Sequence, residues 1–300
     1  MSESVPAAQR LEATAVLLGE GMPIARLLPV RQRRLVGAWC FLDHFGPTDL
    51  NGGRGMRVGP HPHIGLQTVT WLLAGEVLHR DSLGSLQVIR PGQLNLMTAG
   101  RGISHSEESP QPVAPRLHGA QLWIALPESA RHLAPDFAHH EHLPAADCDG
   151  WRITVLIGEA LGARSPARVY MPLVGLDAAT DAPGQCRLPL QPAFEYAFAV
   201  LSGEARVNGE LLQPHAWIYL PPGQSSVLLE SDGPLRLLVL GGEPFPEPVL
   251  MWWNFVGREK AELVKACRDW NAGADYFGAV TGYDGERLSA PMPPWREESA

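Results

Sequence analysis

The sequence predicts an all-β protein, built from two small β-barrels or jelly rolls in tandem with a short helix near the C-terminus. Three observations support this prediction. Glycine (31 residues) and proline (28 residues) are scattered through the 300-residue chain, where they separate short apolar runs. Such punctuation is typical of strands joined by tight turns. The two halves also share a pattern of turns, and one segment near the end has helical spacing.

The first half has the character of strands from about residue 13 to residue 127. Short runs rich in apolar and β-branched residues alternate there with Gly, Pro, Asp or Ser, as expected for strands. The clearest runs are "TVTWLL" (68–73), "LQVIR" (86–90), "LNLMTAG" (94–100) and "AQLWIAL" (120–126).

Strand-like sequence resumes after a loop-rich stretch, so we expect a linker near 130–150 and two domains, 1–140 and 141–300. The runs of the second half are "WRITVLIG" (151–158), "YAFAVLSG" (196–203), "AWIYLP" (216–221) and "LRLLVLGG" (235–242).

A weak internal repeat links the two halves. The segments at 72–100 and 200–223 each contain a Gly-Glu turn, a second turn with Pro, a strand and a closing Gly. A repeat of this kind indicates tandem barrels. Near the end, "REKAELVKACRDW" (258–270) has apolar residues at helical spacing, namely Leu263, Val264, Cys267 and Trp270, which predicts a helix over an open end of one sheet system.

Composition excludes several classes of partner. The formal net charge of −8 disfavours direct binding of nucleic acid, which needs clustered Lys and Arg. The one dense basic run, "RQRR" at 31–34, is typical of a solvated face. No run reaches the ~18 apolar residues of a membrane span, and the first residues lack the pattern of a signal peptide. We therefore expect a cytoplasmic protein with no membrane contact.

The four cysteines, Cys40, Cys148, Cys186 and Cys267, lie far apart and form no C-x-x-C motif. Neither a disulfide framework nor a thiolate metal site is indicated by this spacing. We expect reduced and mostly buried thiols.

Two pairs of potential metal ligands occur in the first half. His61 and His63 precede the run at 68–73, and "GRGISHSE" (100–107) supplies His105 and Glu107 at the same spacing. Side chains two residues apart on a strand point the same way, and a barrel can place two such strands side by side. Three neutral nitrogens and one oxygen suit a first-row divalent metal and leave positions open for other ligands. A closed structural zinc site would usually include thiolates.

These residues lie in segments that strongly resemble the pirin family of the cupin superfamily. The similar segments are "FLDHFGP" (41–47), "HPHIGLQTVTWLLAGEVLHRDSLGS" (61–85) and "RPGQLNLMTAGRGISHSE" (90–107). The dense similarity covers roughly 36–127, and a looser similarity in the second half includes "GEPFPEPV" (242–249).

The resemblance implies two stacked cupin barrels, with one divalent metal ion in the N-terminal barrel (1–140). The metal is usually iron, so we expect Fe(II), with Zn, Ni, Mn and Cu as alternatives. The ligands implied by the family are His61, His63, His105 and Glu107.

The second half offers no equivalent set of ligands. Alignment by the Gly-Glu turns places Pro189 and Gln191 opposite the first histidine pair, and alignment by the later glycines places Leu228 and Glu230 opposite the second pair. One carboxylate cannot hold a metal alone. We therefore expect 141–300 to be a metal-free cupin barrel with a helical tail.

One position departs from the family. Many pirins have Glu where this chain has Gln67. Strand alternation predicts that Gln67 shares the face of His61 and His63, where an amide could orient a water or an imidazole but could not act as a base.

The resemblance favours a metal-dependent dioxygenase of the quercetinase type, acting with dioxygen on a flavonol such as quercetin or a similar planar enol. Glu107 would be the catalytic base that takes the hydroxyl proton. An alternative is an iron-binding, redox-sensitive regulatory protein that acts through protein partners such as transcription factors or metabolic enzymes. A third interpretation is isomerase or epimerase chemistry at the same metal.

Other candidates have simpler interpretations. We expect His44 to be a hydrogen-bonded turn residue, and the cluster at 139–142 (HHEH) to be a solvated loop. Ser104 and Ser106 should face away from His105. Trp252 and Trp253 are most simply packing residues.

Overall fold

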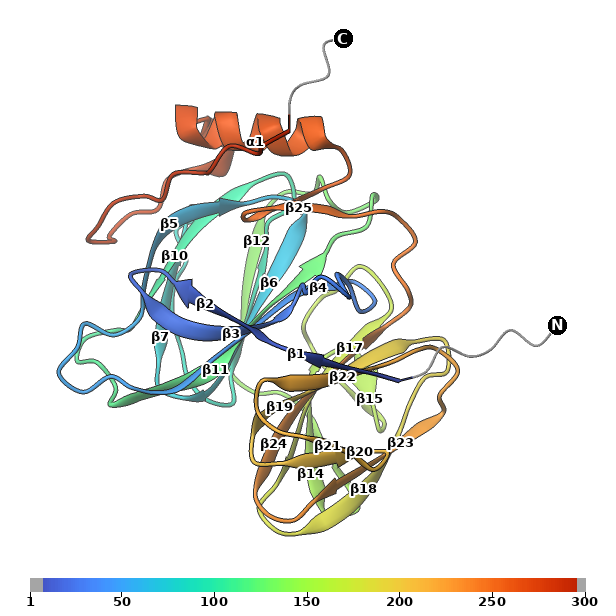
Figure 1. The fold of residues 1–300 in the computed structure, drawn as a ribbon. Helices are drawn as coiled ribbons and strands as arrows, with labels where there is room; N and C mark the ends of the chain where they lie inside the picture. Colours follow the sequence, from blue (N-terminus) through green and yellow to red (C-terminus); the bar gives the residue numbers. More distant parts are fainter. Residues whose placement is uncertain (1–7, 296–300) are drawn as a thin grey trace.

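The chain forms two β-barrels, with one α-helix against the first barrel (Figure 1). The computed structural model describes residues 8–295. Each barrel pairs a seven-stranded sheet with a four-stranded sheet. The prediction of an all-β protein with tandem barrels and a C-terminal helix is confirmed.

The first barrel contains every strand-like run that the sequence placed between 68 and 126. The order of its larger sheet is β12 (Asp136–His140), β9 (Leu94–Thr98), β6 (Leu66–Ala74), β11 (Arg116–Ala125), β4 (Trp39–Asp49), β3 (Met22–Leu28) and β2 (Thr14–Leu18). The smaller sheet has the order β5 (Arg57–His63), β10 (Ile103–Glu108), β7 (Val77–Asp81) and β8 (Leu86–Ile89).

The second barrel repeats this arrangement. Its larger sheet has the order β1 (Gln9–Glu12), β22 (Ala216–Leu220), β19 (Glu195–Ser202), β24 (Leu235–Gly242), β17 (Leu173–Thr180), β14 (Trp151–Ile157) and β13 (Ala145–Cys148). The smaller sheet has the order β18 (Gly184–Pro189), β23 (Ser226–Ser231), β20 (Ala205–Val207) and β21 (Glu210–Leu212). Two ribbons complete the strands, β15 (Glu159–Ala160) with β16 (Ala163–Arg164), and β25 (Leu250–Trp252) with β26 (Phe255–Gly257).

Both ends of the chain cross to the other barrel. Strand β1 precedes the first barrel in the sequence but pairs with β22 of the second barrel. Toward the other end, the β25–β26 ribbon reaches the first barrel through a bridge between Phe255 and Ile64. The domain boundary near residue 140 stays a prediction. Strand β1 and the β25–β26 ribbon each contact the barrel on the other side of this boundary.

Helix α1 (Lys260–Ala272) lies over one end of the first barrel, beside β25 (Figure 1). It begins two residues later than predicted, where the Glu262 carboxylate accepts the N–H groups of Arg258 and Glu259. It ends at Gly273, whose φ of 78° is accessible to glycine at low cost. The apolar face predicted from the sequence is buried. The 3-10 turn η1 (Asp275–Phe277) follows.

The larger sheets of the two barrels share an apolar core. Alternate residues of β6 and β11 point out of the first barrel toward the second, where they meet Trp217, Leu238 and Leu240. Buried hydrogen bonds cross the same interface. Trp39 Nε1 lies 3.2 Å from Val174 O, and Trp71 Nε1 donates to Asp177 Oδ2 at 3.1 Å. The remaining residues of β6 and β11 therefore face the interior of the first barrel.

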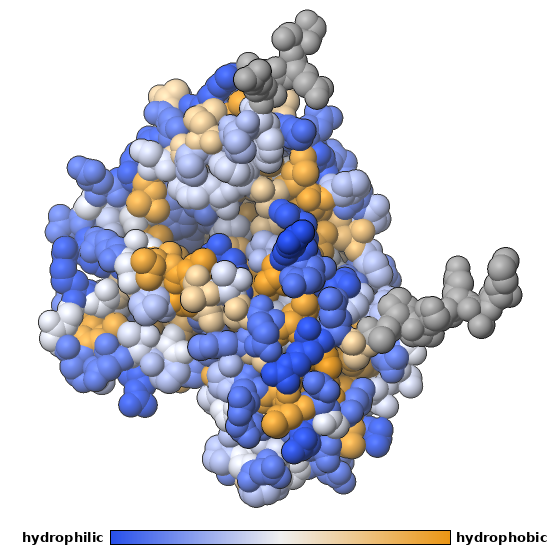
Figure 2. Space-filling model, viewed as in Figure 1, coloured by the Kyte–Doolittle hydropathy of each residue, from blue (hydrophilic) through white to orange (hydrophobic). Residues whose placement is uncertain are grey.

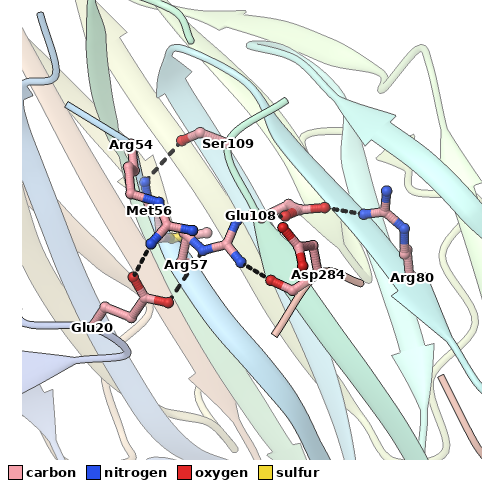
Figure 3. A network of polar contacts seen from close by, with 8 residues as sticks. All are labelled: Glu20, Arg54, Met56, Arg57, Arg80, Glu108, Ser109 and Asp284. Atoms are coloured by element: carbon pink, nitrogen blue, oxygen red, sulfur yellow. Dashed lines mark hydrogen bonds and ion pairs between the residues drawn. The ribbon is translucent and has the colours of Figure 1, made fainter. Parts of the chain in front are cut away.

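An ionic network on the outside of the first barrel fixes the ends of β5 and β10 (Figure 3). Arg57 on β5 pairs with Glu20 at 3.2 Å and with Glu108 at 3.4 Å, and Glu108 also pairs with Arg80 on β7. Arg57 donates to the Asp284 carbonyl as well, which attaches the C-terminal segment to this barrel. Because Glu108 is held on the outside, the preceding residue, Glu107, points inward.

Among residues 8–295, no helix combines the length and the apolar character needed to cross a bilayer.

The buried Asp177 allows the barrel interface to be tested. Its carboxylate accepts hydrogen bonds from Trp71 and from Arg236, and burial raises its pKa. We expect Asp177→Ala to lower the free energy of unfolding by about 2–4 kcal/mol, because the indole and guanidinium lose their acceptor in a buried site. Chemical denaturation measures this change. Asp181→Ala, at an exposed position, is the control, and equal stability of the two variants would contradict the assignment.

Candidate metal centre

A cavity of about 390 Å³ lies inside the first barrel, between its two sheets. The inward-facing residues of β4, β5, β6, β10 and β11 line it, together with residues 253–254 and Leu288 near the C-terminus. All four of the predicted ligands, His61, His63, His105 and Glu107, are buried and belong to this lining.

Three histidines converge on one wall of the cavity. His61 and His63 project from β5, and His105 projects from β10, where it is the register partner of His61. The Nε2 atoms of His63 and His105 are 3.0 Å apart. One nitrogen from each of the three rings lies within 4.8 Å of the nitrogens from the other two. The i, i+2 spacing and the pairing of β5 with β10 therefore bring two distant segments to one point.

In His61 and His63, the hydrogen-bond partner of Nδ1 determines which ring nitrogen carries the proton. His61 Nδ1 donates to Gly59 O at 2.8 Å, and His63 Nδ1 donates to Asn254 O at 3.1 Å. A backbone carbonyl can only accept, so the Nε2 atoms of these two rings are left with free lone pairs.

A chain of hydrogen bonds through His79 and Asp81 selects the same tautomer for His105. Its Nδ1 lies 3.4 Å from His79 Nδ1, and His79 Nε2 donates to Asp81 Oδ2 at 3.0 Å. Since the N–H of a neutral His79 ring is on Nε2 and donates to the carboxylate, its Nδ1 can only accept, and the Nδ1–H of His105 is the donor. The Nε2 of His105 is therefore also unprotonated.

The electrostatics of the site suit a cation. Burial lowers the pKa of His61 to about 4, and burial and the neighbouring imidazole of His61 hold the pKa of His63 and of His105 well below the usual value. The rings are therefore neutral at pH 7, which is the state that binds metal. Two lone pairs that face each other at 3.0 Å repel unless a cation lies between them. A separation of 3.0 Å is short enough for both nitrogens to bind one ion at the usual metal–nitrogen distance of about 2.1 Å.

Glu107 lies at the edge of this group. Its carboxylate is within 4.8 Å of ring nitrogens of His105 and His79, and Thr70 Oγ1 lies 3.4 Å from its Oε1. Burial raises its pKa, and a cation beside it would favour the ionised form. The donor set of three imidazoles and one carboxylate fits a divalent metal. That His61, His63, His105 and Glu107 are the ligands stays a prediction.

His79 and Asp81, which orient His105, were not among the residues predicted from the sequence. The signal was present, because "VLHRD" (77–81) places these residues two apart on a strand, as in the other two pairs. Trp253 was interpreted as a packing residue, but it also lines the cavity. Arg26 and Asp43, which form an ion pair at 2.7 Å in the lining, have no local signature in the sequence.

The expectation for Gln67 was wrong. Its amide donates to Thr98 Oγ1 at 2.9 Å and to Arg168 O, in the second half of the chain, at 3.0 Å. Alternation cannot be counted from His63 to Gln67, because β5 ends at His63 and β6 starts a new sheet after Gly65, whose φ is +70°. Gln67 therefore faces the second barrel.

Other histidines lie outside the cavity lining. His44, expected in a turn, is on β4 and lies 2.9 Å from His118 between their Nε2 atoms. The expectation of a solvated loop at 139–142 was wrong in part, because His139 and His140 belong to β12, and His139 Nδ1 lies 2.7 Å from Asn95 Oδ1. Ser104 faces away from the cavity, as predicted, and donates to Gly278 O.

The corresponding strands of the second barrel, β18 and β23, have an apolar interior face. Leu188, Val227 and Leu229 are fully buried in the core of that barrel. That the second barrel holds no metal stays a prediction.

The fold and the site together define a two-barrel cupin protein with a histidine-lined cavity in its first barrel. Comparison with known families gives the particular assignment. Residues 21–124 match the family model described as Pirin, and residues 175–276 match the model described as Pirin C-terminal cupin domain. The chain belongs to the pirin family.

Three similar proteins illustrate the relationship. A Pseudomonas aeruginosa protein named as a candidate quercetin 2,3-dioxygenase is 49% identical over 96% of this chain and 91% of its own length. A pirin-like protein of Caulobacter vibrioides is 38% identical over 83% of this chain and 88% of its own. The crystal structure of quercetin 2,3-dioxygenase from Acinetobacter baumannii superposes with a TM-score of 0.94 at 46% identity, covering 97% of both chains.

The hydrogen-bond chain behind His105 predicts the effect of a single-atom change. In Asp81→Asn the amide would donate to His79 Nε2, so the proton of His79 would move to Nδ1, and His105 would carry its proton on Nε2. We expect metal affinity to fall about 10–100-fold, measured by competition with a chromogenic chelator. His142→Gln, at an exposed position, is the matched histidine control. Unchanged affinity in Asp81→Asn would refute the role of the chain.

Proposed function

We propose that the protein is a cytoplasmic, metal-dependent dioxygenase that acts on a flavonol such as quercetin or on a similar planar enol. Its metal would be Fe(II), held by His61, His63, His105 and Glu107. The observation that carries this proposal is the convergence of three neutral imidazoles on the wall of a cavity large enough for a small aromatic molecule. The names of the Pseudomonas and Acinetobacter relatives support it.

The walls of the cavity suit a flat substrate. The rings of Phe41 and Trp123 are stacked with centroids 3.9 Å apart and planes 10° apart, and Trp253 belongs to the same lining. The guanidinium of Arg26 lies 4.5 Å from the centre of the Phe41 ring. Flat apolar walls with a few polar groups are typical of sites that bind aromatic ligands.

The mouth of the cavity is apolar. Figure 2 shows apolar side chains (orange) gathered on the surface where β2 and β3 lie in Figure 1. Leu17 and Leu18 from this region line the cavity, and Leu17 is 74% exposed. An aromatic substrate would pass an apolar entrance and lose its hydrating water there.

The residues of the site have separate tasks in this proposal. A bound metal would supply Lewis-acid activation and a template for the substrate and dioxygen. Glu107 would take the hydroxyl proton of an enol. Because a carboxylate held by a cation is a weak base, this role would require Glu107 to release the metal when the substrate binds. The aromatic walls orient the ring system, and burial of the site excludes water.

Oxygen consumption tests the proposal directly. Protein loaded anaerobically with Fe(II) should bind one ion per chain and consume dioxygen when quercetin is added. His105→Ala should lose both the ion and the activity, because a central nitrogen ligand is missing. Metal analysis and an oxygen electrode give the two readouts. Loaded protein that consumes no oxygen with any flavonol would overturn the dioxygenase assignment.

The same experiment separates the second candidate, an iron-dependent regulatory protein that acts through a protein partner. The apolar patch over β2 and β3 (Figure 2), the region to which the exposed Leu17 belongs, favours this alternative, because a contiguous exposed apolar patch suits a protein partner. One bound ion without turnover of any flavonol is the result that supports it. The net charge of −8 makes a protein a more suitable partner than nucleic acid.

Trp253 tests the contribution of the walls. In Trp253→Leu we expect the KM for quercetin to rise about 3–10-fold, since one aromatic contact is lost, while the metal content stays the same. Trp295→Leu is the matched control, because Trp295 packs on Trp252 and does not line the cavity. A Trp253→Leu variant with the KM of the control would show that the substrate lies elsewhere.

A further inference from the structure

Two of the four cysteines meet in the second barrel, although 38 positions separate them in the sequence. Cys148 is the last residue of β13, in the larger sheet, and Cys186 lies on β18, in the smaller sheet. The thiol of Cys186 donates to Cys148 Sγ, and the two sulfur atoms are 2.7 Å apart. A disulfide bond is about 2.05 Å long, so a shift of roughly 0.7 Å would join them.

The surroundings give the two thiols different roles. Cys186 is fully buried in the core of the second barrel, whereas Cys148 is 8% exposed. Burial, together with the neighbouring thiol of Cys148, raises the pKa of Cys186. A thiol held in its protonated form is a poor nucleophile. Attack on an external reagent therefore begins at Cys148, the more exposed of the two residues.

We propose that Cys148 and Cys186 form a site of reversible disulfide formation, whose co-substrate is a small disulfide such as oxidised glutathione. Cys148, as its thiolate, attacks one sulfur of the reagent, which breaks the reagent's S–S bond and releases one thiolate. Cys186 then loses its proton and attacks Cys148 Sγ, which expels the second thiolate. The two protein protons go to the two released thiolates, which become thiols. The cysteines are oxidised and the reagent is reduced.

A metal site is the competing interpretation of these residues. The two sulfurs and the Asp149 carboxylate lie within 4.8 Å of one another, but that carboxylate already accepts the N–H of Arg187 at 3.0 Å. Metal binding would also require two thiolates side by side in an apolar core, which burial opposes. Formation of a disulfide removes both ionisable groups and leaves a neutral, apolar link.

The other two cysteines provide internal controls. Cys40 is fully buried against the first barrel, and burial raises its pKa to about 12. Cys267 lies on α1, where its thiol donates to Pro291 O at 3.6 Å, and burial raises its pKa to about 11. These two belong to different apolar clusters.

The test is a thiol count on the full-length chain after exposure to oxidised glutathione. We expect the four thiols of the reduced chain to fall to two, and a non-reducing peptide map to show one cross-link between the peptides of Cys148 and Cys186. Dithiothreitol should restore all four. Closure of this loop should also raise the thermal midpoint by about 5–10 °C.

Variants distinguish the proposed pair from other reactions. Cys148→Ser and Cys186→Ser should each abolish the cross-link, while Cys267→Ser, the matched control, should retain it. Four free thiols after oxidation, or a glutathione adduct that remains on Cys148 without closing, would overturn the proposal. So would binding of zinc to the wild-type chain that Cys148→Ser removes and His105→Ala does not. The peptide map of the wild-type chain tests for the Cys148–Cys186 cross-link even if a variant fails to fold.

Discussion

The site depends on a single electrostatic constraint: three buried, uncharged imidazoles are held inside the first barrel with their unprotonated nitrogens facing one another. The 3.0 Å separation of the Nε2 atoms of His63 and His105 would be repulsive without a positive charge between them. Each ring is kept in this state by a partner for its Nδ1, either a backbone carbonyl or the His79–Asp81 pair. The proton positions of the whole cluster therefore follow from its surroundings.

The rest of the fold holds those partners in place. Asn254, whose carbonyl binds His63, belongs to the segment that crosses back from the second barrel to cover the first. Asp81, which orders the chain to His105, is itself fixed by the N–H groups of Leu83 and Ser85. The second barrel thus contributes to the site without lining it, because the segment that holds Asn254 follows its strand β24, and β1, which precedes the first barrel, pairs with its strand β22.

In the proposed function, metal binding and substrate recognition would use different sheets of the first barrel. The histidines come from the smaller sheet, through β5 and β10. Phe41 and Trp123, which provide flat walls, come from β4 and β11 of the larger sheet. Substitutions on the larger sheet can therefore change the ligand without disturbing the donor set.

The sequence alone determined whatever depends on local periodicity. Alternation along strands predicted that His61, His63, His105 and Glu107 face one barrel interior, and all four line its cavity. Turn residues located most of the strands, and helical spacing located α1. Only the tertiary structure decided which strands become neighbours. It directed Gln67 to the other barrel, because alternation does not continue past Gly65, and it brought Cys148 to Cys186 from a different sheet. Period-two alternation is a property of a single strand, whereas the pairing of sheets reflects burial summed over the whole chain.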